Sequence, residues 1–301
     1  MTIKELLNQG IIMLKNEGID SPKNKARLIL EYTLKKSREY LIIYDKQEVT
    51  PKQRDLYIKN IKKIIKGIPL QYITGIQEFM KMKFFVTKDV LIPQPDTEIL
   101  VEEVIKIAQT IDRPLILDLC TGSGAIAVSI AKYLPGVEIV ATDISSKALE
   151  IAKHNAKFNS VKSNIEFVES NLFAKLKNRK FDIIVSNPPY IPTDEIKMLP
   201  KDVQYEPIIA LDGGKDGLDF YKKIINISDE YLKQHGYLCL EIGYNQKESI
   251  RKIIAKDKKI KDAYFKKDLC KNDRVVIAKF VWQISTICAI LWTCRRGEKC
   301  I

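Results

Sequence analysis

The chain has 301 residues, which is long enough for an enzyme domain and a smaller companion domain. Hydrophobic residues make up 46% of it, which supports a packed core and excludes an extensively disordered protein. The formal net charge of +12 indicates either a solvated basic face or a polyanionic partner such as RNA, DNA or an acidic protein surface.

The cysteine and histidine pattern argues against a metal centre. None of the six cysteines forms a C-x2-C pair, and His154 and His235 are the only histidines. We therefore expect neither a zinc site nor a disulfide framework. The N-terminal segment MTIKELLNQG lacks the apolar core of a signal peptide, so we expect a cytoplasmic protein. We also expect a monomer without stable membrane association.

The first part of the chain carries helix signals. Thr2 and Glu5 have the spacing of a capping box, and Ser21 and Thr50, each followed by proline, open two further helices. Apolar residues follow each start at helical intervals. This stretch contains no catalytic constellation, so we predict a helical substrate-docking domain over residues 1–75.

A different pattern follows. Residues 78–92, EFMKMKFFVTKDVLI, partly alternate and contain β-formers, which predicts a hairpin or two short strands. We assign residues 76–97 to this β-hairpin linker, which ends in a proline-bounded loop over 93–98. A helix is expected from about residue 98 to 110.

From residue 115 onward the chain alternates between short apolar strands and helices. The pattern predicts an α/β fold with a Rossmann-like open, mostly parallel sheet and helices on both faces, over residues 98–281. Expected strands are 115–119, 138–143, 165–170, 181–187, 236–242 and 274–280, and expected helices are 125–134 and 146–159. Residues 282–301 form an atypical tail, whose charge-free run is shorter than the roughly twenty residues of a membrane-spanning helix.

The segment 117–125, LDLCTGSGA, runs from a strand through a glycine turn into a helix. Because glycine has no Cβ, such a turn lets backbone amides approach a ligand closely. Asp143 ends the next strand, where a carboxylate can accept both ribose hydroxyls of a nucleoside cofactor. Ala127 replaces the third glycine of the dinucleotide fingerprint, so the pattern favours S-adenosylmethionine.

Asn187-Pro188-Pro189-Tyr190 follows the strand at 181–187, where open α/β sheets place their ligands. A planar amide or aromatic amine nitrogen is a poor nucleophile, and two acceptors on its N–H groups can orient it. Asn187 offers a side-chain oxygen and Pro188 a carbonyl, while the prolines stiffen the turn and Tyr190 can stack on a flat group. The other interpretation of the motif is a simple turn.

Together these motifs resemble class I methyltransferases that act on exocyclic amino groups or side-chain amides. The wider match resembles the PrmC/HemK family of release factor glutamine-N5 methyltransferases. It runs through 69–75, 84–98, the glycine turn, the N-P-P-Y motif, 206–218, 241–243 and 273–276.

The resemblance implies methyl transfer from S-adenosylmethionine, with S-adenosylhomocysteine as product, to the glutamine of the Gly-Gly-Gln loop of a release factor, which the helical domain helps to hold. It implies catalysis by Asn187, Pro188 and Tyr190, with Pro189 also contacting the substrate. The expected cofactor-binding residues are Asp118, Cys120, Thr121, Gly122, Ser123, Gly124, Asp143, Leu172 and Asn187.

The chain departs from the family pattern at Cys120, where glycine is usual, and at Gln94, where arginine is usual. A Cβ at position 120 restricts the turn if that residue needs a positive φ. Two other functions compete with glutamine methylation: an adenine-N6 or other nucleic-acid amino-methyltransferase, and a non-catalytic ribosome-associated protein that binds the cofactor. The basic surface suits the first of these through weak contact with nucleic acid.

Overall fold

A computed structural model describes residues 1–281 as two compact units. The first unit contains residues 1–93 together with 194–211, and the described part of the second contains residues 94–193 and 212–281. The predicted tail, residues 282–301, lies outside the described residues. Within residues 1–281, no helix combines the length and apolar character that crossing a membrane requires.

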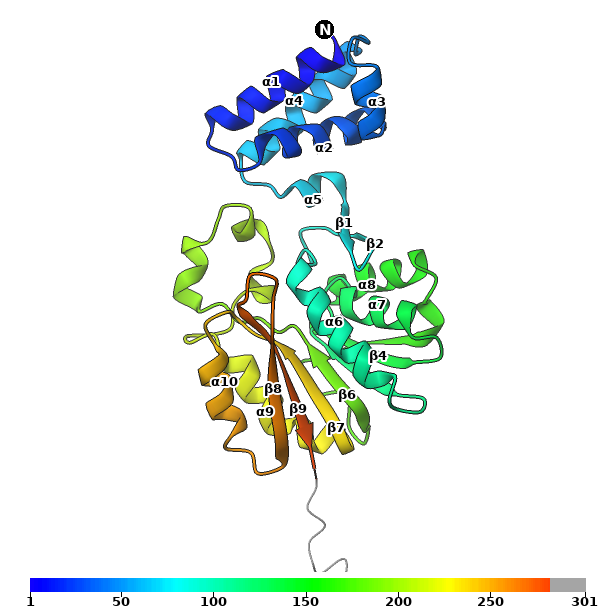
Figure 1. The fold of residues 1–301 in the computed structure, drawn as a ribbon, viewed down its shortest axis with the longest axis vertical. Helices are drawn as coiled ribbons and strands as arrows, with labels where there is room; N and C mark the ends of the chain where they lie inside the picture. Colours follow the sequence, from blue (N-terminus) through cyan, green and yellow to red (C-terminus); the bar gives the residue numbers. More distant parts are fainter. Residues whose placement is uncertain (282–301) are drawn as a thin grey trace, which may run out of the picture. The chain divides into compact units, whose positions relative to one another are not determined.

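The first unit is built mainly from helices (Figure 1). The capping box of Thr2 and Glu5 is confirmed, because each side chain accepts from the other residue's backbone N–H. Thr50 and Gln53 form a second capping box at the start of another helix. The helices are α1 (Ile3–Asn16), α2 (Pro22–Leu34), α3 (Arg38–Ile43), α4 (Pro51–Ile65) and α5 (Leu70–Thr74).

The helices of the first unit enclose their own core, and a short hairpin follows them. Leu6, Leu14, Ile29 and Ile61 are fully buried in this core, together with Tyr57. The predicted hairpin is β1 (Ile76–Phe79) and β2 (Met82–Phe85), which pair antiparallel. Three short 3-10 helices, η2 (Thr193–Met198), η3 (Val203–Tyr205) and η4 (Ile208–Ala210), lie along the segment that returns to this unit.

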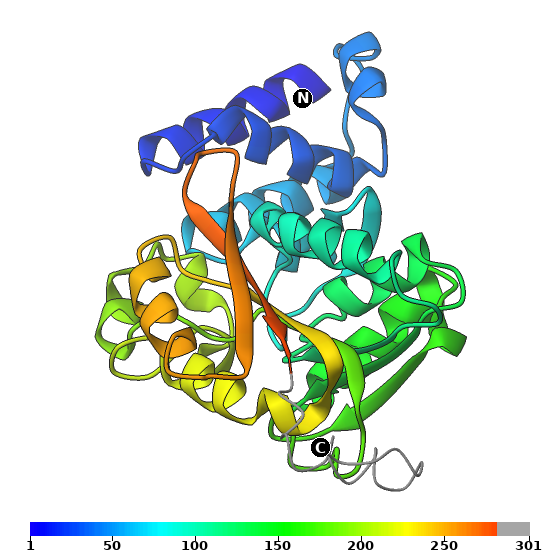
Figure 2. The same cartoon turned by 60° about the horizontal axis from the view of Figure 1, so that its bottom comes forward.

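The second unit is a seven-stranded sheet in the order β5-β4-β3-β6-β7-β9-β8. Strands β3 to β7 pair in parallel, and β9 runs antiparallel to both of its neighbours, β7 and β8 (Figure 2). The expectation of an open, mostly parallel sheet is confirmed. The strands are β3 (Leu115–Leu119), β4 (Glu138–Asp143), β5 (Ile165–Glu169), β6 (Phe181–Ser186), β7 (Leu232–Glu241), β8 (Ile260–Lys267) and β9 (Asp273–Phe280).

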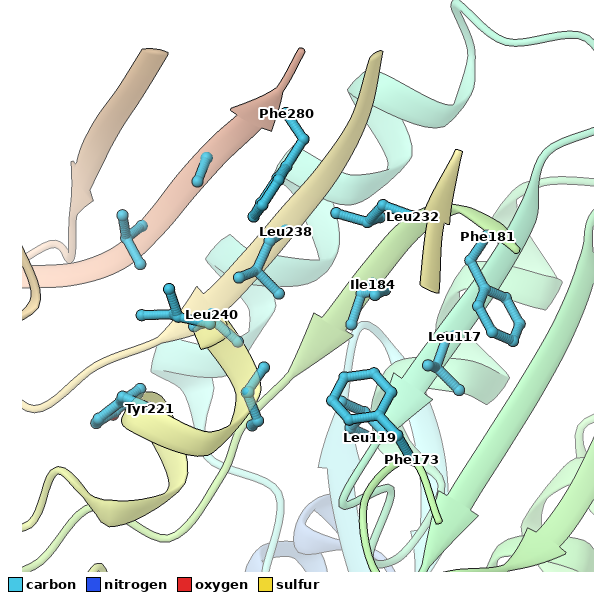
Figure 3. Packing of buried hydrophobic residues seen from close by; sticks show 14 of the residues in the cluster. Leu117, Leu119, Phe173, Phe181, Ile184, Tyr221, Leu232, Leu238, Leu240 and Phe280 are labelled. Atoms are coloured by element: carbon cyan, nitrogen blue, oxygen red, sulfur yellow. The ribbon is translucent and has the colours of Figure 1, made fainter. Parts of the chain in front are cut away.

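Alternation along the strands builds a core on each face of the sheet. Leu117 and Leu119 join Ile184, Leu238 and Leu240 in a cluster that also buries apolar residues of α9 and α10 (Figure 3). The opposite face of β3 carries Asp118, which is bonded to the first turn of α7. The helices of this unit are α6 (Pro95–Ala108), α7 (Ala125–Tyr133), α8 (Ser146–Phe158), α9 (Asp219–Tyr231) and α10 (Lys247–Ile254).

One helix begins earlier than expected, and one strand was not expected from the sequence. Helix α6 begins at Pro95 instead of residue 98, because proline fits the first turn of a helix, where its missing N–H needs no partner. The sequence pattern also missed the edge strand β8, whose mixture of exposed and half-buried residues gives no clear apolar signal.

Candidate active site

The two motifs predicted from the sequence meet where the strand order reverses. The chain runs outward from β3 through β4 to β5, and then returns to place β6 on the other side of β3. Leu119 at the end of β3 pairs with both Thr142 and Ser186, so Cys120, Asp143 and Asn187 lie at adjacent positions along the carboxyl edge of the sheet. Ligands of open α/β sheets bind at this kind of switch point.

The turn after β3 is held by backbone hydrogen bonds and left-handed residues. Thr121 N donates to Thr142 O at 2.9 Å, and Gly124 N donates to Thr121 O at 2.8 Å. Cys120, Gly122 and Gly124 have φ values of +59°, +55° and +79°. The positive φ of Cys120 meets the condition under which a side chain at this position restricts the turn. A left-handed conformation costs a non-glycine residue about 1–2 kcal/mol.

Asp118 lies beneath the turn and organises it. Its side chain is fully buried, and its Oδ2 accepts from Thr121 Oγ1 at 2.6 Å and from Ala127 N at 3.2 Å. Its Oδ1 has no hydrogen-bond partner among the described residues. Burial raises the pKa of Asp118 to about 7, against the opposing effect of those hydrogen bonds.

Asp143 lies beside the same turn. Its two carboxylate oxygens accept from Gly122 N and from Ser145 N, each at 2.9 Å. Burial raises the pKa of Asp143, and these backbone donors oppose that rise. The carboxylate is therefore fixed in orientation at the carboxyl edge of β4.

Ser123 and Leu172 complete the predicted cofactor set at this edge. Ser123 is buried, and its carbonyl accepts from Asn155 Nδ2 at 2.8 Å, which attaches the turn to α8. Leu172 follows β5 with a φ of +47° and is half-buried. Ser170 Oγ donates to Leu172 O at 2.8 Å, and Ser170 N donates to Asp143 O at 2.9 Å, so the loop stays next to β4.

The N-P-P-Y motif leaves β6 with a defined side-chain arrangement. Pro188 and Pro189 are buried, while Asn187 and Tyr190 are half-buried. Asn187 Nδ2 donates to Thr97 Oγ1 at 3.2 Å. The asparagine is therefore attached to the first turn of α6.

Gln246 fastens the far end of the motif. Its Nε2 donates to Tyr190 O at 2.9 Å and to Gly217 O at 3.2 Å, and its Oε1 accepts from Gly243 N at 2.9 Å. A Cβ added at Gly217 would lie 2.4 Å from Tyr190 O, so only glycine fits there. These contacts therefore hold the Tyr190 end of the N-P-P-Y motif, which is the end farther along the chain from β6.

Thr97 and Glu241 lie beside the N-P-P-Y motif, although neither was predicted as a site residue from the sequence. Thr97 Oγ1 donates to Glu241 Oε2 at 2.6 Å, and Tyr190 OH lies 3.4 Å from Glu241 Oε1 as a weaker donor. Burial raises the pKa of Glu241 to about 7, while the Thr97 hydrogen bond and Arg274 oppose that rise. Both residues lie in segments that carry the family resemblance, which was the available signal.

Arg274 links the surroundings of Glu241 to two further carboxylates. Its guanidinium Nη2 lies 3.1 Å from both Asp96 Oδ2 and Asp268 Oδ2. The Arg274 side chain is 12% exposed and that of Asp268 is 4% exposed, so this pair is shielded from water, whereas Asp96 is exposed. Among residues 1–281, no cluster of His, Cys, Asp and Glu side chains is arranged to hold a metal ion.

Comparison with known proteins identifies the family. The PrmC N-terminal domain family matches residues 5–75, and the methyltransferase small domain family matches residues 94–199. A release factor glutamine methyltransferase of Clostridium acetobutylicum is 40% identical over 281 residues, which cover 92% of this chain and 98% of that protein. The chain belongs to the release factor glutamine methyltransferase family.

Other relatives agree with this assignment. A release factor glutamine methyltransferase of Fusobacterium nucleatum is 41% identical and covers 91% of this chain and 78% of its own. The hMettl16 catalytic domain, solved with an RNA hairpin, has a TM-score of 0.56 at 18% identity and covers 71% of this chain and 81% of its own. That likeness shows the fold alone, which is that of class I methyltransferases.

The residues at the edge of the sheet fit S-adenosylmethionine, the methyl donor of these enzymes. A Cβ added at Gly122 would meet no atom closer than Cys120 O at 4.0 Å, so the turn leaves open space beside a fixed carboxylate. The ligand carries hydroxyl and ammonium donors but no phosphate. Asp143, whose carboxylate is fixed beside that space, is an acceptor suited to such donors.

Proposed function

We propose that this chain transfers a methyl group from S-adenosylmethionine to the side-chain amide nitrogen, N5, of the glutamine in the Gly-Gly-Gln motif of peptide chain release factors. The observation that carries this proposal is the position of Asn187-Pro188-Pro189-Tyr190 at the switch point beside the glycine turn. Relatives that carry this activity in their names cover 91–92% of this chain, which favours glutamine over a nucleic-acid base.

The cofactor would lie against the turn after β3. Asp143 would accept the ribose hydroxyls, Leu172 would lie beside the adenine, and Asn187 would contact cofactor and substrate together. The backbone of the turn would embrace the amino-acid portion, through the residues Asp118, Cys120, Thr121, Gly122, Ser123 and Gly124. When bound, S-adenosylmethionine supplies an electrophilic methyl group on a positively charged sulfur and leaves as S-adenosylhomocysteine.

The protein would act on the glutamine by orientation and exclusion of water. The Oδ1 of Asn187 and the carbonyl of Pro188 would accept the two N–H groups of the substrate amide, so that the nitrogen lone pair faces the methyl group. Pro189 would stiffen the loop, and Tyr190 would lie along the flat amide. Such catalysis rests on positioning and electrostatics and needs no covalent enzyme intermediate.

The helical domain, residues 1–75, would dock the release factor. One face of α4 carries Lys59, Lys62 and Lys63, and Lys66 follows the end of the helix. None of these lysines has an ion pair within the described residues, and they line a hollow of about 880 Å³. Unpaired cations attract an acidic partner surface over roughly 10 Å at ordinary ionic strength. We further propose a cytoplasmic monomer, with weak contact between this basic surface and nucleic acid.

Methyl transfer from labelled S-adenosylmethionine tests the proposal directly. We expect label on purified release factor, and none on its Gly-Gly-Gln→Gly-Gly-Ala variant or on bulk DNA. Label on DNA alone would replace the proposal with base methylation. No label on any substrate, with intact cofactor binding, would favour a non-catalytic binding protein.

A further inference from the structure

A buried chain of polar groups leads away from Asn187. Asn187 Nδ2 donates to Thr97 Oγ1 at 3.2 Å, and Thr97 Oγ1 donates to Glu241 Oε2 at 2.6 Å. Thr97 is 4% exposed and Glu241 is 2% exposed, so water does not compete for these bonds. The three residues come from α6, the loop after β6 and the end of β7.

The chemistry of the three groups determines which of them donates and which accepts each hydrogen bond. A threonine hydroxyl has one proton to donate, and an ionised carboxylate can only accept. Thr97 therefore donates its hydroxyl hydrogen bond to Glu241, and the Thr97 oxygen can only accept a hydrogen bond from Asn187. The asparagine must then turn its NH₂ group toward Thr97, so that its Oδ1 points away from Thr97 within the amide plane.

We propose that Thr97 and Glu241 are positioning residues that set the orientation of the Asn187 amide and so select a substrate group that brings N–H donors. This inference rests on the proposed function, because it concerns how the same site recognises the glutamine amide. With the opposite orientation, Asn187 would point its own N–H groups at the substrate NH₂. Two donors facing one another leave both unsatisfied, which disfavours binding and reaction.

The groups around Glu241 make the direction of the hydrogen bonds between Asn187, Thr97 and Glu241 depend on pH. Tyr190 OH lies near its Oε1, and Tyr221 OH donates to its main-chain oxygen at 3.0 Å. Arg274 favours the ionised carboxylate, whereas Asp96 and burial favour the protonated form. A protonated Glu241 could donate to Thr97, whose own proton could then turn toward Asn187 and reverse the amide.

Paired substitutions at Thr97 test the inference in the full-length enzyme. Valine has nearly the volume of threonine but no hydroxyl, whereas serine keeps the hydroxyl and loses a methyl group. We expect Thr97→Val to lower kcat for release factor methylation roughly tenfold to hundredfold, and Thr97→Ser to stay within about threefold of wild type. The dissociation constant for S-adenosylmethionine should change far less than kcat, because Thr97 lies outside the turn that would hold most of the cofactor.

Thr33→Val is a matched control, because Thr33 is buried and its Oγ1 has no hydrogen-bond partner among the described residues. It should leave kcat unchanged. Glu241→Gln, which can donate to Thr97, should lower kcat as Thr97→Val does. Thermal unfolding of each variant checks the fold, and the two Thr97 variants decide the matter if Glu241→Gln does not fold.

The outcomes separate this inference from the proposed function. If the wild-type enzyme methylates release factor and Thr97→Val has the same kcat, the positioning role of Thr97 and Glu241 is overturned, while the proposed function stands. An equal loss of kcat in Thr97→Ser and Thr97→Val has the same consequence. A merely structural role predicts that serine, which leaves a small void, is the more damaging change. A wild-type enzyme that binds S-adenosylmethionine but does not methylate release factor overturns the proposed function and this inference together.

Discussion

Replacing Gly124 with alanine would place a methyl group against the neighbouring helix. The new Cβ would lie 3.0 Å from Ala152 Cβ and 3.1 Å from Ala152 Cα, and the second of these is a backbone atom that cannot move away alone. Forcing such a contact costs about 1–3 kcal/mol. The φ of +79° adds about 1–2 kcal/mol for a non-glycine residue.

Gly122 provides a comparison within the same turn. Its φ is +55°, but a Cβ there would meet nothing closer than 4.0 Å. Gly122→Ala should therefore lose only about 1 kcal/mol of unfolding free energy, because alanine also restricts the unfolded chain and recovers part of the strain. Gly124→Ala should lose about 2–4 kcal/mol. Cofactor affinity should fall more in Gly122→Ala than in Gly124→Ala, since the methyl group at 122 enters the open space beside Asp143.

Urea unfolding and calorimetry with S-adenosylmethionine check both parts of this prediction. We expect the unfolding midpoint to fall further for Gly124→Ala, and the folded Gly122→Ala protein to bind S-adenosylmethionine at least tenfold more weakly than wild type, which is about 1.4 kcal/mol. Equal stability of the two variants would refute the packing argument. Wild-type affinity in Gly122→Ala would refute the assignment of that space to the cofactor.

Four further predictions concern other parts of the molecule. Asn187→Ala should lower methyl transfer roughly a hundredfold or more with nearly unchanged thermal unfolding, and near-normal activity would contradict the acceptor role. Asp143→Ala should weaken cofactor binding roughly tenfold in calorimetry, and an unchanged dissociation constant would contradict the ribose assignment. Burial raises the pKa of Glu206 from 4.5 to about 7, so its folded form holds a proton more tightly than the unfolded chain and its stabilisation is lost as the pH rises through about 7. Glu206→Gln should therefore be more stable than wild type by up to about 3 kcal/mol at pH 8 but not at pH 4, as measured by urea unfolding at both values. Lys62→Glu should raise KM for release factor without changing kcat, whereas Lys23→Glu should change neither; equal effects would argue against docking on α4.

Most of the sheet could be predicted from the sequence, because buried parallel strands are short and almost wholly apolar. The strands at 115–119 and 138–143 begin and end where the pattern places them. The edge strand β8 could not be predicted in the same way, because Ile260–Lys267 mixes charged, exposed and half-buried residues without a continuous apolar run. Its position depends on pairing with β9, which is a tertiary interaction.

The candidate site likewise has one part that local sequence predicts and another part that depends on tertiary contacts. The glycine turn is encoded locally, and the positive φ values of Gly122 and Gly124 follow from residues adjacent in the chain. The bond from Asn187 to Thr97 joins residues that are 90 positions apart, and the bond from Thr97 to Glu241 joins residues that are 144 positions apart. No local pattern specifies such pairs. The resemblance pointed to their segments but gave no role to either side chain.

The two halves of the site are organised in the same way. Thr121 donates to Asp118 at 2.6 Å beneath the glycine turn, and Thr97 donates to Glu241 at 2.6 Å behind the N-P-P-Y motif. Burial raises the pKa of each carboxyl to about 7, so the charged forms destabilise the folded state at higher pH. Apolar side chains of similar volume could stabilise these positions more. The carboxylates instead orient hydrogen bonds. Each accepts the only hydrogen bond that a threonine hydroxyl can donate, and this determines which neighbouring groups donate and which accept. Preorganised polarity of this kind is what methyl transfer to a weakly nucleophilic amide requires of its enzyme.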